Sequence, residues 1–354
     1  MMYAKRQAAA SRLLSKADAY LVTDRSNVRY LTGFTGSSGV LLLTATRRLF
    51  ITDFRYKEQS SHEVNGCEVE IAKKSLIKSA ITACRSAGAK SLAFESSMVY
   101  STYADLAASG VTMLPVADHI NLIRSVKDEA EIALIREAAR RAEAAFLDMK
   151  KSIRAGATES ALATKLSERL RCHGCKRMPF DIILASGENS AMPHAGVTNR
   201  KLKPGDLVTI DWGGECDGYF SDMTRTYLLK GGADTQKKRA IYDLVLRANR
   251  AAIKKVRPGA ASREVDGAAR GLIKGEGYGE YFGHGLGHGV GLDVHELPRV
   301  TWAKSAPLKR GMVFTVEPGV YVPGTGGVRI EEMVLVGAKG AEVLTALPVE
   351  LEII

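Results

Sequence analysis

Two segments of the chain carry acidic residues on both sides of a glycine-rich turn, and these segments restrict the possible folds more than any other feature. In residues 206–226, two β-prone runs flank a turn expected near Cys216 and Asp217. Pairing about that turn places Asp211 opposite Asp222 on one face of a hairpin. Opposed side chains lie about 5 Å apart, and like charges at that separation repel. This hairpin alone is compatible with a solvated surface pair or with a bound cation.

A second hairpin of the same kind is expected in residues 313–333. Its midpoint falls on Gly324, which places Glu317 opposite Glu331. Pro318 cannot donate to a strand ladder and indicates an edge or bulge beside Glu317. Both hairpins begin with apolar β-branched runs that favour burial, and buried carboxylates are costly unless they are paired or bind metal. The two hairpins together therefore predict a metal site.

Histidines are concentrated in one glycine-rich segment, residues 281–298. His284, His288 and His295 follow one another at intervals of four and seven residues, and the glycines between them allow close approach to a ligand. The spacing matches neither a nucleotide-binding glycine fingerprint nor the helical motif of zinc proteases. His194 lies in a turn-like stretch suited to a cleft. The remaining histidines are expected to be structural or merely exposed: His62, His119 and His173.

These segments resemble those of the pita-bread metallopeptidases, the family of methionine aminopeptidase, aminopeptidase P, prolidase and creatinase. The run Gly-His288-Gly-Val-Gly-Leu-Asp-Val-His295-Glu resembles its histidine motif. Thr-Val-Glu317-Pro-Gly-Val-Tyr and Gly-Gly-Val-Arg-Ile-Glu331-Glu resemble its two glutamate motifs. The resemblance implies a dinuclear metal site, with Asp222 and Glu331 bridging both ions. The implied ligands are Asp211, Asp222, His288, Glu317 and Glu331.

The resemblance also implies roles for residues around the metals. His194 would orient or polarise the substrate, and His295 would contact the scissile carbonyl and stabilise the developing oxyanion. His284 resembles an extra histidine of the proline-specific branch and is expected to bind substrate. Arg299 matches in position an arginine that prolidase-like members use for the terminal carboxylate of a dipeptide. A plain surface role for Arg299 is an equal alternative, because charged residues are mostly exposed.

The donor set suggests the chemistry. Four carboxylates and one imidazole suit Mn²⁺ and tolerate Co²⁺, Fe²⁺ or Zn²⁺. Two such ions about 3.5–4 Å apart lower the pKa of a shared water, and the resulting hydroxide would attack the peptide carbonyl. Glu317 is the expected proton shuttle and hence a catalytic residue, because the bridging carboxylates are fully engaged. Arg329 lies on the same strand face as Glu331 and is expected to orient the metal carboxylates.

Two domains are expected. Short β runs alternate with helical stretches between residues 19 and 122, which predicts a small α/β domain over residues 1–123. It resembles the N-terminal domain of aminopeptidase P, prolidase and creatinase, which in the family accompanies cleavage before proline and dimer formation. Residues 124–354 are expected to form an α+β pita-bread catalytic domain with a curved, mainly antiparallel sheet. Helices are expected at residues 128–151, 158–172, 235–256 and 262–274.

Composition excludes several classes of function. The net charge is +11, but the basic residues come as scattered doublets, so a solvated surface is expected rather than a nucleic-acid site. No apolar run approaches the ~20 residues that span a bilayer, and no apolar stretch follows the basic N-terminus as in a signal peptide. The five cysteines, including Cys172 and Cys175, favour free thiols in a reducing, cytoplasmic compartment.

The predicted function is metal-dependent hydrolysis of the peptide bond before proline in proline-containing peptides. The enzyme would be an Xaa-Pro aminopeptidase or an Xaa-Pro dipeptidase, expected to form a homodimer. A methionine-type aminopeptidase is a weaker alternative, because the added N-terminal domain disfavours it. A non-catalytic peptide- or protein-binding member of the fold is the other alternative. Such a scaffold would have no need of His194, His284 and His295 around a metal cluster.

Overall fold

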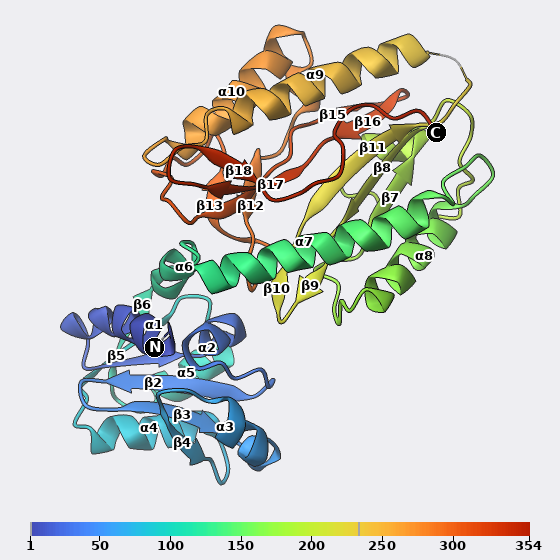
Figure 1. Ribbon diagram of the computed structural model, residues 1–354. Coiled ribbons are helices and arrows are strands. Elements are labelled where there is room, and N and C mark those ends of the chain that lie inside the picture. The colour runs from blue at the N-terminus through green and yellow to red at the C-terminus, as the bar shows by residue number, and fades with distance from the viewer. Residues whose placement is uncertain (1, 233) are drawn as a thin grey trace. The chain divides into compact units, whose positions relative to one another are not determined.

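The computed structural model describes residues 2–232 and 234–354 (Figure 1). The chain divides into two compact units, the first ending at Arg124 and the second beginning at Ser125. Within the described residues, none of the helices combines the length and apolar character that crossing a bilayer requires.

The N-terminal unit is built on a six-stranded mixed sheet in the order β4-β3-β2-β1-β5-β6. Its central strand β1 (Ala19–Val22) pairs antiparallel with β2 (Gly39–Thr44) and parallel with β5 (Ser91–Glu95). The other strands are β3 (Arg48–Thr52), β4 (Glu68–Ile71) and β6 (Thr112–Val116). The helices are α1 (Met2–Ser11), α2 (Arg25–Thr32), α3 (Lys57–Glu63), α4 (Leu76–Ser86), α5 (Tyr100–Ala107) and α6 (His119–Arg124). This arrangement confirms the predicted α/β class.

Four long helices frame the second unit: α7 (Glu129–Lys150), α8 (Glu159–Cys172), α9 (Thr235–Ile253) and α10 (Ser262–Gly275). A capping box starts α7, because the Asp128 side chain accepts from the Glu131 amide while the Glu131 side chain accepts from the Asp128 amide. The predicted helices are confirmed, with ends that coincide with the prediction or differ from it by at most three residues. The largest shift is in α9, which ends at Ile253 instead of residue 256.

The strands of the second unit lie between α9 and α10 on one side and α7 and α8 on the other (Figure 1). All pairings between its strands are antiparallel, as the predicted fold requires. One sheet has the order β11-β8-β7 and another the order β13-β12-β14-β17-β18. The strands are β7 (Ile183–Ser186), β8 (Leu207–Trp212), β9 (Glu215–Cys216), β10 (Tyr219–Phe220), β11 (Met223–Leu228), β12 (Gly287–Gly289), β13 (Glu296–Val300), β14 (Val313–Val316), β15 (Gly319–Val322), β16 (Gly326–Arg329), β17 (Glu332–Val336) and β18 (Ala341–Val343).

Apolar packing fixes these strands against the helices. The ring of Trp212 in β8 stacks on Phe146 of α7 at 4.4 Å between centroids, and its indole N–H donates to the Ala142 carbonyl at 3.0 Å. On the other side, Ile241 and Val245 of α9 join one buried cluster with side chains of β14, β16 and β17. Buried side chains therefore hold both faces of the strands that carry the predicted site residues.

Candidate metal centre

Glu317 and Glu331 occupy matching positions in a single antiparallel register. β14 pairs with β17, with Val316 opposite Glu332, and β15 pairs with β16, with Gly319 opposite Arg329. The two glutamates lie in the gap between these pairs, where the strands are interrupted beside Pro318. The predicted opposition of Glu317 and Glu331 about Gly324 is therefore confirmed.

In the first hairpin the strand register differs from the predicted register by two residues. Asp211 lies opposite Thr224 in the β8–β11 ladder, not opposite Asp222. The turn is centred on Asp217 and Gly218, which both have positive φ (44° and 79°) and form the two-residue loop between β9 and β10. An Asp-Gly pair favours this type of turn. Because side chains alternate with a period of two, the shift of two residues leaves Asp211 and Asp222 on the same side.

Donor atoms from distant segments converge beyond the two hairpins. Carboxylate oxygens and imidazole nitrogens lie within 4.8 Å of one another in three overlapping groups. The His288 Nε2 atom is 3.4 Å from a Glu317 carboxylate oxygen and 3.6 Å from an Asp222 oxygen. The structure thus gathers all five residues predicted as ligands, which we call the carboxylate–histidine cluster: Asp211, Asp222, His288, Glu317 and Glu331.

Hydrogen bonds around the cluster orient its members. The His288 Nδ1 atom lies 3.2 Å from the Gly289 carbonyl, which can only accept, so Nδ1 carries the proton and Nε2 presents its lone pair to the carboxylates. Burial lowers the pKa of His288 to about 4 and keeps the ring neutral. A neutral imidazole with its other nitrogen hydrogen-bonded is the usual form of a metal-ligating histidine.

The carboxylates have hydrogen-bond partners of their own. Arg329 donates from Nη2 to Asp211 Oδ2 at 2.7 Å, and Thr224 donates to Glu331 at 2.7 Å. The Thr315 hydroxyl donates to Glu317 at 3.1 Å. Arg329 therefore orients a cluster carboxylate in the structure, as expected from its place on the strand face.

Without a cation this gathering of acids is electrostatically unfavourable. Burial raises the pKa of Asp222 well above its usual value, and the charges of Glu331 and Asp211 raise it further. Burial likewise raises the pKa of Glu331 and brings the pKa of Glu317 to about 8. Two buried oxygens, Oδ1 of Asp211 and Oδ1 of Asp222, accept no hydrogen bond from the described part of the chain. Unsatisfied buried oxygens of this kind fit a bound cation.

Sequence comparisons identify the family. The profile of metallopeptidase family M24 matches residues 133–338, and that of the creatinase/prolidase N-terminal domain matches residues 9–126. The chain belongs to metallopeptidase family M24. Both family resemblances expected from the sequence motifs are therefore confirmed.

Individual M24 relatives match over almost the whole chain. An Xaa-Pro dipeptidase of Pyrococcus horikoshii is 37% identical over 338 residues, which are 94% of this chain and 94% of that protein. The structure of an Xaa-Pro dipeptidase from Bacillus anthracis is similar with a TM-score of 0.96 at 36% identity, covering 99% of this chain and 100% of that one. An X-Pro aminopeptidase from Thermotoga maritima has a TM-score of 0.89 at 35% identity, with 98% and 99% covered.

Family M24 enzymes depend on a dinuclear metal site, and the donor set of this chain fits one. Each of the three donor groups combines at least two carboxylates or a carboxylate with imidazoles. The two unsatisfied aspartate oxygens and the raised carboxyl pKa values are the features that binding of divalent cations would relieve.

A cavity of about 450 Å³ opens onto the cluster. Its lining includes the four residues predicted to contact substrate, in addition to the cluster: His194, His284, His295 and Arg299. His295 stacks edge-on against His288 at 4.3 Å between ring centroids. Arg299 lies opposite His288 in the β12–β13 ladder, so both side chains project from the same face of the sheet. The structure therefore brings every predicted site residue to one cavity.

Sequence reasoning missed Tyr321. Its hydroxyl accepts from Arg329 Nη1 at 2.9 Å and lies 3.0 Å from His284 Nε2. The His284 Nδ1 atom donates to the Gly285 carbonyl at 2.8 Å, so Nε2 must accept from Tyr321. Both nitrogens of His284 are thus engaged, and a substrate group that binds Nε2 must displace the tyrosine hydroxyl. The sequence contained a signal for it, because Tyr321 is the last residue of the glutamate motif that runs from Thr315.

The histidines and cysteines assigned no role lie elsewhere. His62 pairs with Glu58 on the surface, and His173 pairs with Asp148. The His119 ring bonds the Ala10 carbonyl at 3.0 Å. All five cysteines are free in the described chain, and Cys172 ends α8 as expected of an ordinary thiol at a helix end.

Proposed function

We propose that this M24 enzyme is an Xaa-Pro dipeptidase that uses two Mn²⁺ ions. The observation that carries the proposal is the shared cavity, in which Arg299 lies on the same strand face as His288 and beside the carboxylate–histidine cluster. A guanidinium binds a carboxylate bidentately, so Arg299 is placed to hold the terminal carboxylate of a dipeptide. The similarity to Xaa-Pro dipeptidases of two organisms supports this choice.

The five cluster residues would hold the metal ions. Four carboxylates with one imidazole form a hard, oxygen-rich donor set, which supports Mn²⁺ as the native metal. When bound, the two ions supply Lewis acidity and lower the pKa of the attacking water. Asp222 and Glu331, each of which belongs to two of the three donor groups, would be the ligands shared by both ions.

The remaining steps fall to side chains of the cavity. Glu317 takes the proton from the attacking water and passes it to the proline nitrogen as the C–N bond breaks. Its partner Thr315 donates to one carboxylate oxygen and leaves the other to the reaction. His295 and His194 donate to the carbonyl oxygen, on which negative charge develops. His284 lines the same cavity, and its ring is held there by the hydrogen bond to Tyr321.

The same proposal includes a cytoplasmic homodimer. The free thiols support a reducing compartment. The adjacent residues Val99 and Tyr100 at the start of α5 are exposed at 65% and 80%, and this apolar patch supports a covered surface on the N-terminal unit. Sedimentation velocity of the full chain would test it, because a monomer at micromolar concentration contradicts the dimer.

The test is hydrolysis of an Xaa-Pro dipeptide and an Xaa-Pro-Yaa tripeptide by metal-stripped enzyme, before and after addition of Mn²⁺. We expect Mn²⁺-dependent cleavage of the dipeptide. Cleavage of the tripeptide alone would make the enzyme an Xaa-Pro aminopeptidase. Cleavage of neither with any divalent metal would contradict the peptidase assignment and favour a binding protein.

Two variants sharpen this test. Arg299→Ala should raise KM for the dipeptide about 10- to 100-fold, because a charged hydrogen bond is lost, and leave the tripeptide little affected. Arg257→Ala is the matched control, since Arg257 is a surface arginine paired with Glu264. Glu317→Gln should bind metal but lose most of kcat. Full turnover by that variant with both metals bound would exclude Glu317 as the proton shuttle.

A further inference from the structure

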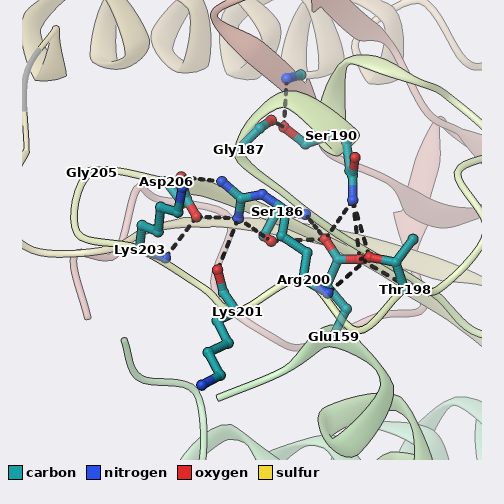
Figure 2. A network of polar contacts seen from close by, with 12 residues as sticks. Glu159, Ser186, Gly187, Ser190, Thr198, Arg200, Lys201, Lys203, Gly205 and Asp206 are labelled. Atoms are coloured by element: carbon teal, nitrogen blue, oxygen red, sulfur yellow. Dashed lines mark hydrogen bonds and ion pairs between the residues drawn. The ribbon is translucent and has the colours of Figure 1, made fainter. Parts of the chain in front are cut away.

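Both ends of the loop that carries His194 are hydrogen-bonded to the same buried carboxylate. It leaves β7 at Ser186, passes through a short 3-10 helix (Gly187–Ala191), and reaches Thr198 four residues after His194. Glu159, the first residue of α8, has no exposed surface. Its side chain lies between the two ends of this loop (Figure 2).

Glu159 accepts hydrogen bonds from both ends of the loop. One carboxylate oxygen accepts from the amide and the hydroxyl of Ser186, each at 2.8 Å. The other accepts from the amide of Thr198 at 3.1 Å and from its hydroxyl at 2.5 Å. The side-chain amide of Asn189 reaches both oxygens, at 3.1 and 3.2 Å. One carboxylate thereby closes the loop, and hydrogen bonds to a charged acceptor are the stronger kind.

The start of α8 adds backbone bonds to the same anchor. The amide of Glu159 donates to the Arg200 carbonyl at 3.1 Å, and the amide of Ser160 donates to the Thr198 carbonyl at 2.9 Å. These amides belong to the first turn of the helix, where they lack partners within the helix and where negative charge is favoured. The end of the loop is therefore fixed to α8 by side-chain and main-chain contacts together.

The opposite side of the loop is fixed to the cluster. Arg329 donates from Nη1 to the Pro193 carbonyl at 3.1 Å, directly before His194, and the same guanidinium holds Asp211. The amide of Gly327 donates to the Ser190 hydroxyl at 2.9 Å. A Cβ atom at Gly327 would lie 2.0 Å from the Ser190 carbonyl oxygen, so the loop packs directly on β16. His194 thus lies between an anchor at Glu159 and an anchor at Arg329.

We propose that Glu159 is a positioning residue that fixes His194 relative to the metal cluster through the 187–198 loop. A buried carboxylate costs free energy unless it is fully hydrogen-bonded. Here all of its bonds go to the loop and to the residues that flank it. The inference rests on the proposed function in one respect, because it takes His194 as one of the two histidines that donate to the scissile carbonyl.

The test is a double-mutant cycle of Glu159→Gln and His194→Ala on the metal-loaded enzyme. Glutamine keeps the volume but turns an NH₂ group toward one loop end, where amide donors already point. We expect Glu159→Gln to lower kcat about tenfold with KM little changed, and to lower it less than twofold when His194 is already alanine. Equal losses in both backgrounds would overturn the proposal and leave Glu159 as a stability residue.

Matched variants separate positioning from general destabilisation. Glu131→Gln alters another buried glutamate in the first turn of a helix, one that accepts from the Asp128 amide and the Tyr219 hydroxyl. It should lower the melting temperature without lowering kcat. Thr198→Val removes one donor to Glu159 from an exposed position, and Thr198→Ser should restore the kcat that the valine loses. An equal loss of kcat in the valine and serine variants would contradict the proposal.

Amide hydrogen exchange gives a readout without activity. Glu159→Gln should speed exchange in peptides covering residues 187–198 and leave peptides from α7 unchanged. Unchanged exchange in the loop would overturn the inference even if the enzyme is an active dipeptidase. Faster loop exchange in a protein that cleaves no Xaa-Pro peptide would instead keep the anchor and reject the proposed function.

Discussion

The two hairpins each supply two carboxylates to the cluster. We call the less buried one of each pair, Asp211 and Glu317, the outer carboxylate, and the more deeply buried one, Asp222 and Glu331, the inner carboxylate. The two outer carboxylates have different hydrogen-bond partners. Asp211, from the β8–β11 hairpin, receives a charged hydrogen bond from Arg329 at 2.7 Å. Glu317, beside Pro318 in the second hairpin, receives a neutral hydroxyl bond from Thr315 at 3.1 Å. A charged partner holds a carboxylate more firmly than a neutral one. The difference suits Asp211 to a fixed ligand role and Glu317 to exchanging a proton.

The inner carboxylates of the two hairpins are more alike. Asp222 and Glu331 are both buried, and burial together with neighbouring acids raises the pKa of each. Thr224, opposite Asp211 on the first hairpin, donates to Glu331 of the second. A hydrogen bond to an inner carboxylate therefore links the two hairpins, whereas the hydrogen-bond partners of the outer carboxylates differ between them.

The largest effect is expected where the hairpins are alike. Asp222→Asn and Glu331→Gln should each lower kcat/KM at least about 10³-fold, because each removes a proposed ligand of the dinuclear centre. Asp217→Asn is the control on the first hairpin, since Asp217 is an exposed turn residue at positive φ that asparagine tolerates. Steady-state kinetics with Xaa-Pro dipeptide would check this. A strong loss in only one of the two variants would show that the inner carboxylates are not equivalent.

A smaller effect is expected at the charged partner of the outer carboxylate. Arg329→Lys removes the fork that contacts Asp211, Tyr321 and the Pro193 carbonyl. Metal affinity should fall about 10- to 100-fold, as for other residues that orient metal ligands. Competition titration with a metal chelator would measure it, with the melting temperature as the control for folding. Unchanged affinity would mean that Arg329 does not orient the ligand.

The sequence predicted the second hairpin more accurately than the first. Gly324 lies at the centre of a glycine-rich turn between two runs of equal length, so the midpoint located the register of Glu317 and Glu331. In the first hairpin the Asp217-Gly218 pair was the better guide to the turn, and centring one residue earlier shifted the pairing by two. Side chains alternate between the two faces of a strand, so a register shift of two residues still places Asp211 and Asp222 on the same face. The predicted ligand set was therefore unaffected.

Contacts between distant segments could not be predicted. The bond from Thr224 to Glu331 spans 107 residues of chain, and the bond from Arg329 to the Pro193 carbonyl spans 136. Local patterns of hydrophobicity and turns carry no information about such pairs. Glu159 was missed for the same reason, because in the sequence it is only an acidic residue in the first turn of a helix, where acids are common.

The metal-free protein should become less stable as pH rises from about 6.5 to about 8. The folded pKa of Glu317 is raised from 4.5 to about 8, so stability is lost as pH rises through that range. Two histidines have the opposite effect, but at lower pH. Folding lowers the pKa values of His284 and His288 from 6.5 to about 4, so their contribution to stability rises with pH and is complete near pH 6.5. Asp222 and Glu331 add to the trend of Glu317.

Thermal unfolding in chelator at pH 6.5, 7.2 and 8 would check this expectation. The melting temperature should fall by several degrees across the series, and by less in Glu317→Gln. Mn²⁺ should abolish the fall, because the bound cation favours the ionised carboxylates. A melting temperature that rises with pH in chelator would contradict the raised carboxyl pKa values.

The smallest effects are expected at the two threonines. Thr224→Val and Thr315→Val each remove one neutral hydrogen bond, worth about 1 kcal/mol or fivefold. Thr224→Val should weaken metal binding, because its partner Glu331 is an inner carboxylate. Thr315→Val should instead shift the pH profile of kcat, because its partner Glu317 is the proposed proton shuttle. The serine variants are the controls, and identical behaviour of the two valine variants would remove the distinction between inner and outer carboxylates.

The most direct test of the account is the number of metal ions that each chain binds. Enzyme stripped with chelator, reloaded with Mn²⁺ and freed of excess ions would be analysed by inductively coupled plasma mass spectrometry. The account predicts two ions per wild-type chain, recovery of Xaa-Pro hydrolysis with the second ion, and fewer than two ions in Asp222→Asn. Full activity with one ion or none per chain would contradict the claim that the two hairpins build a dinuclear centre.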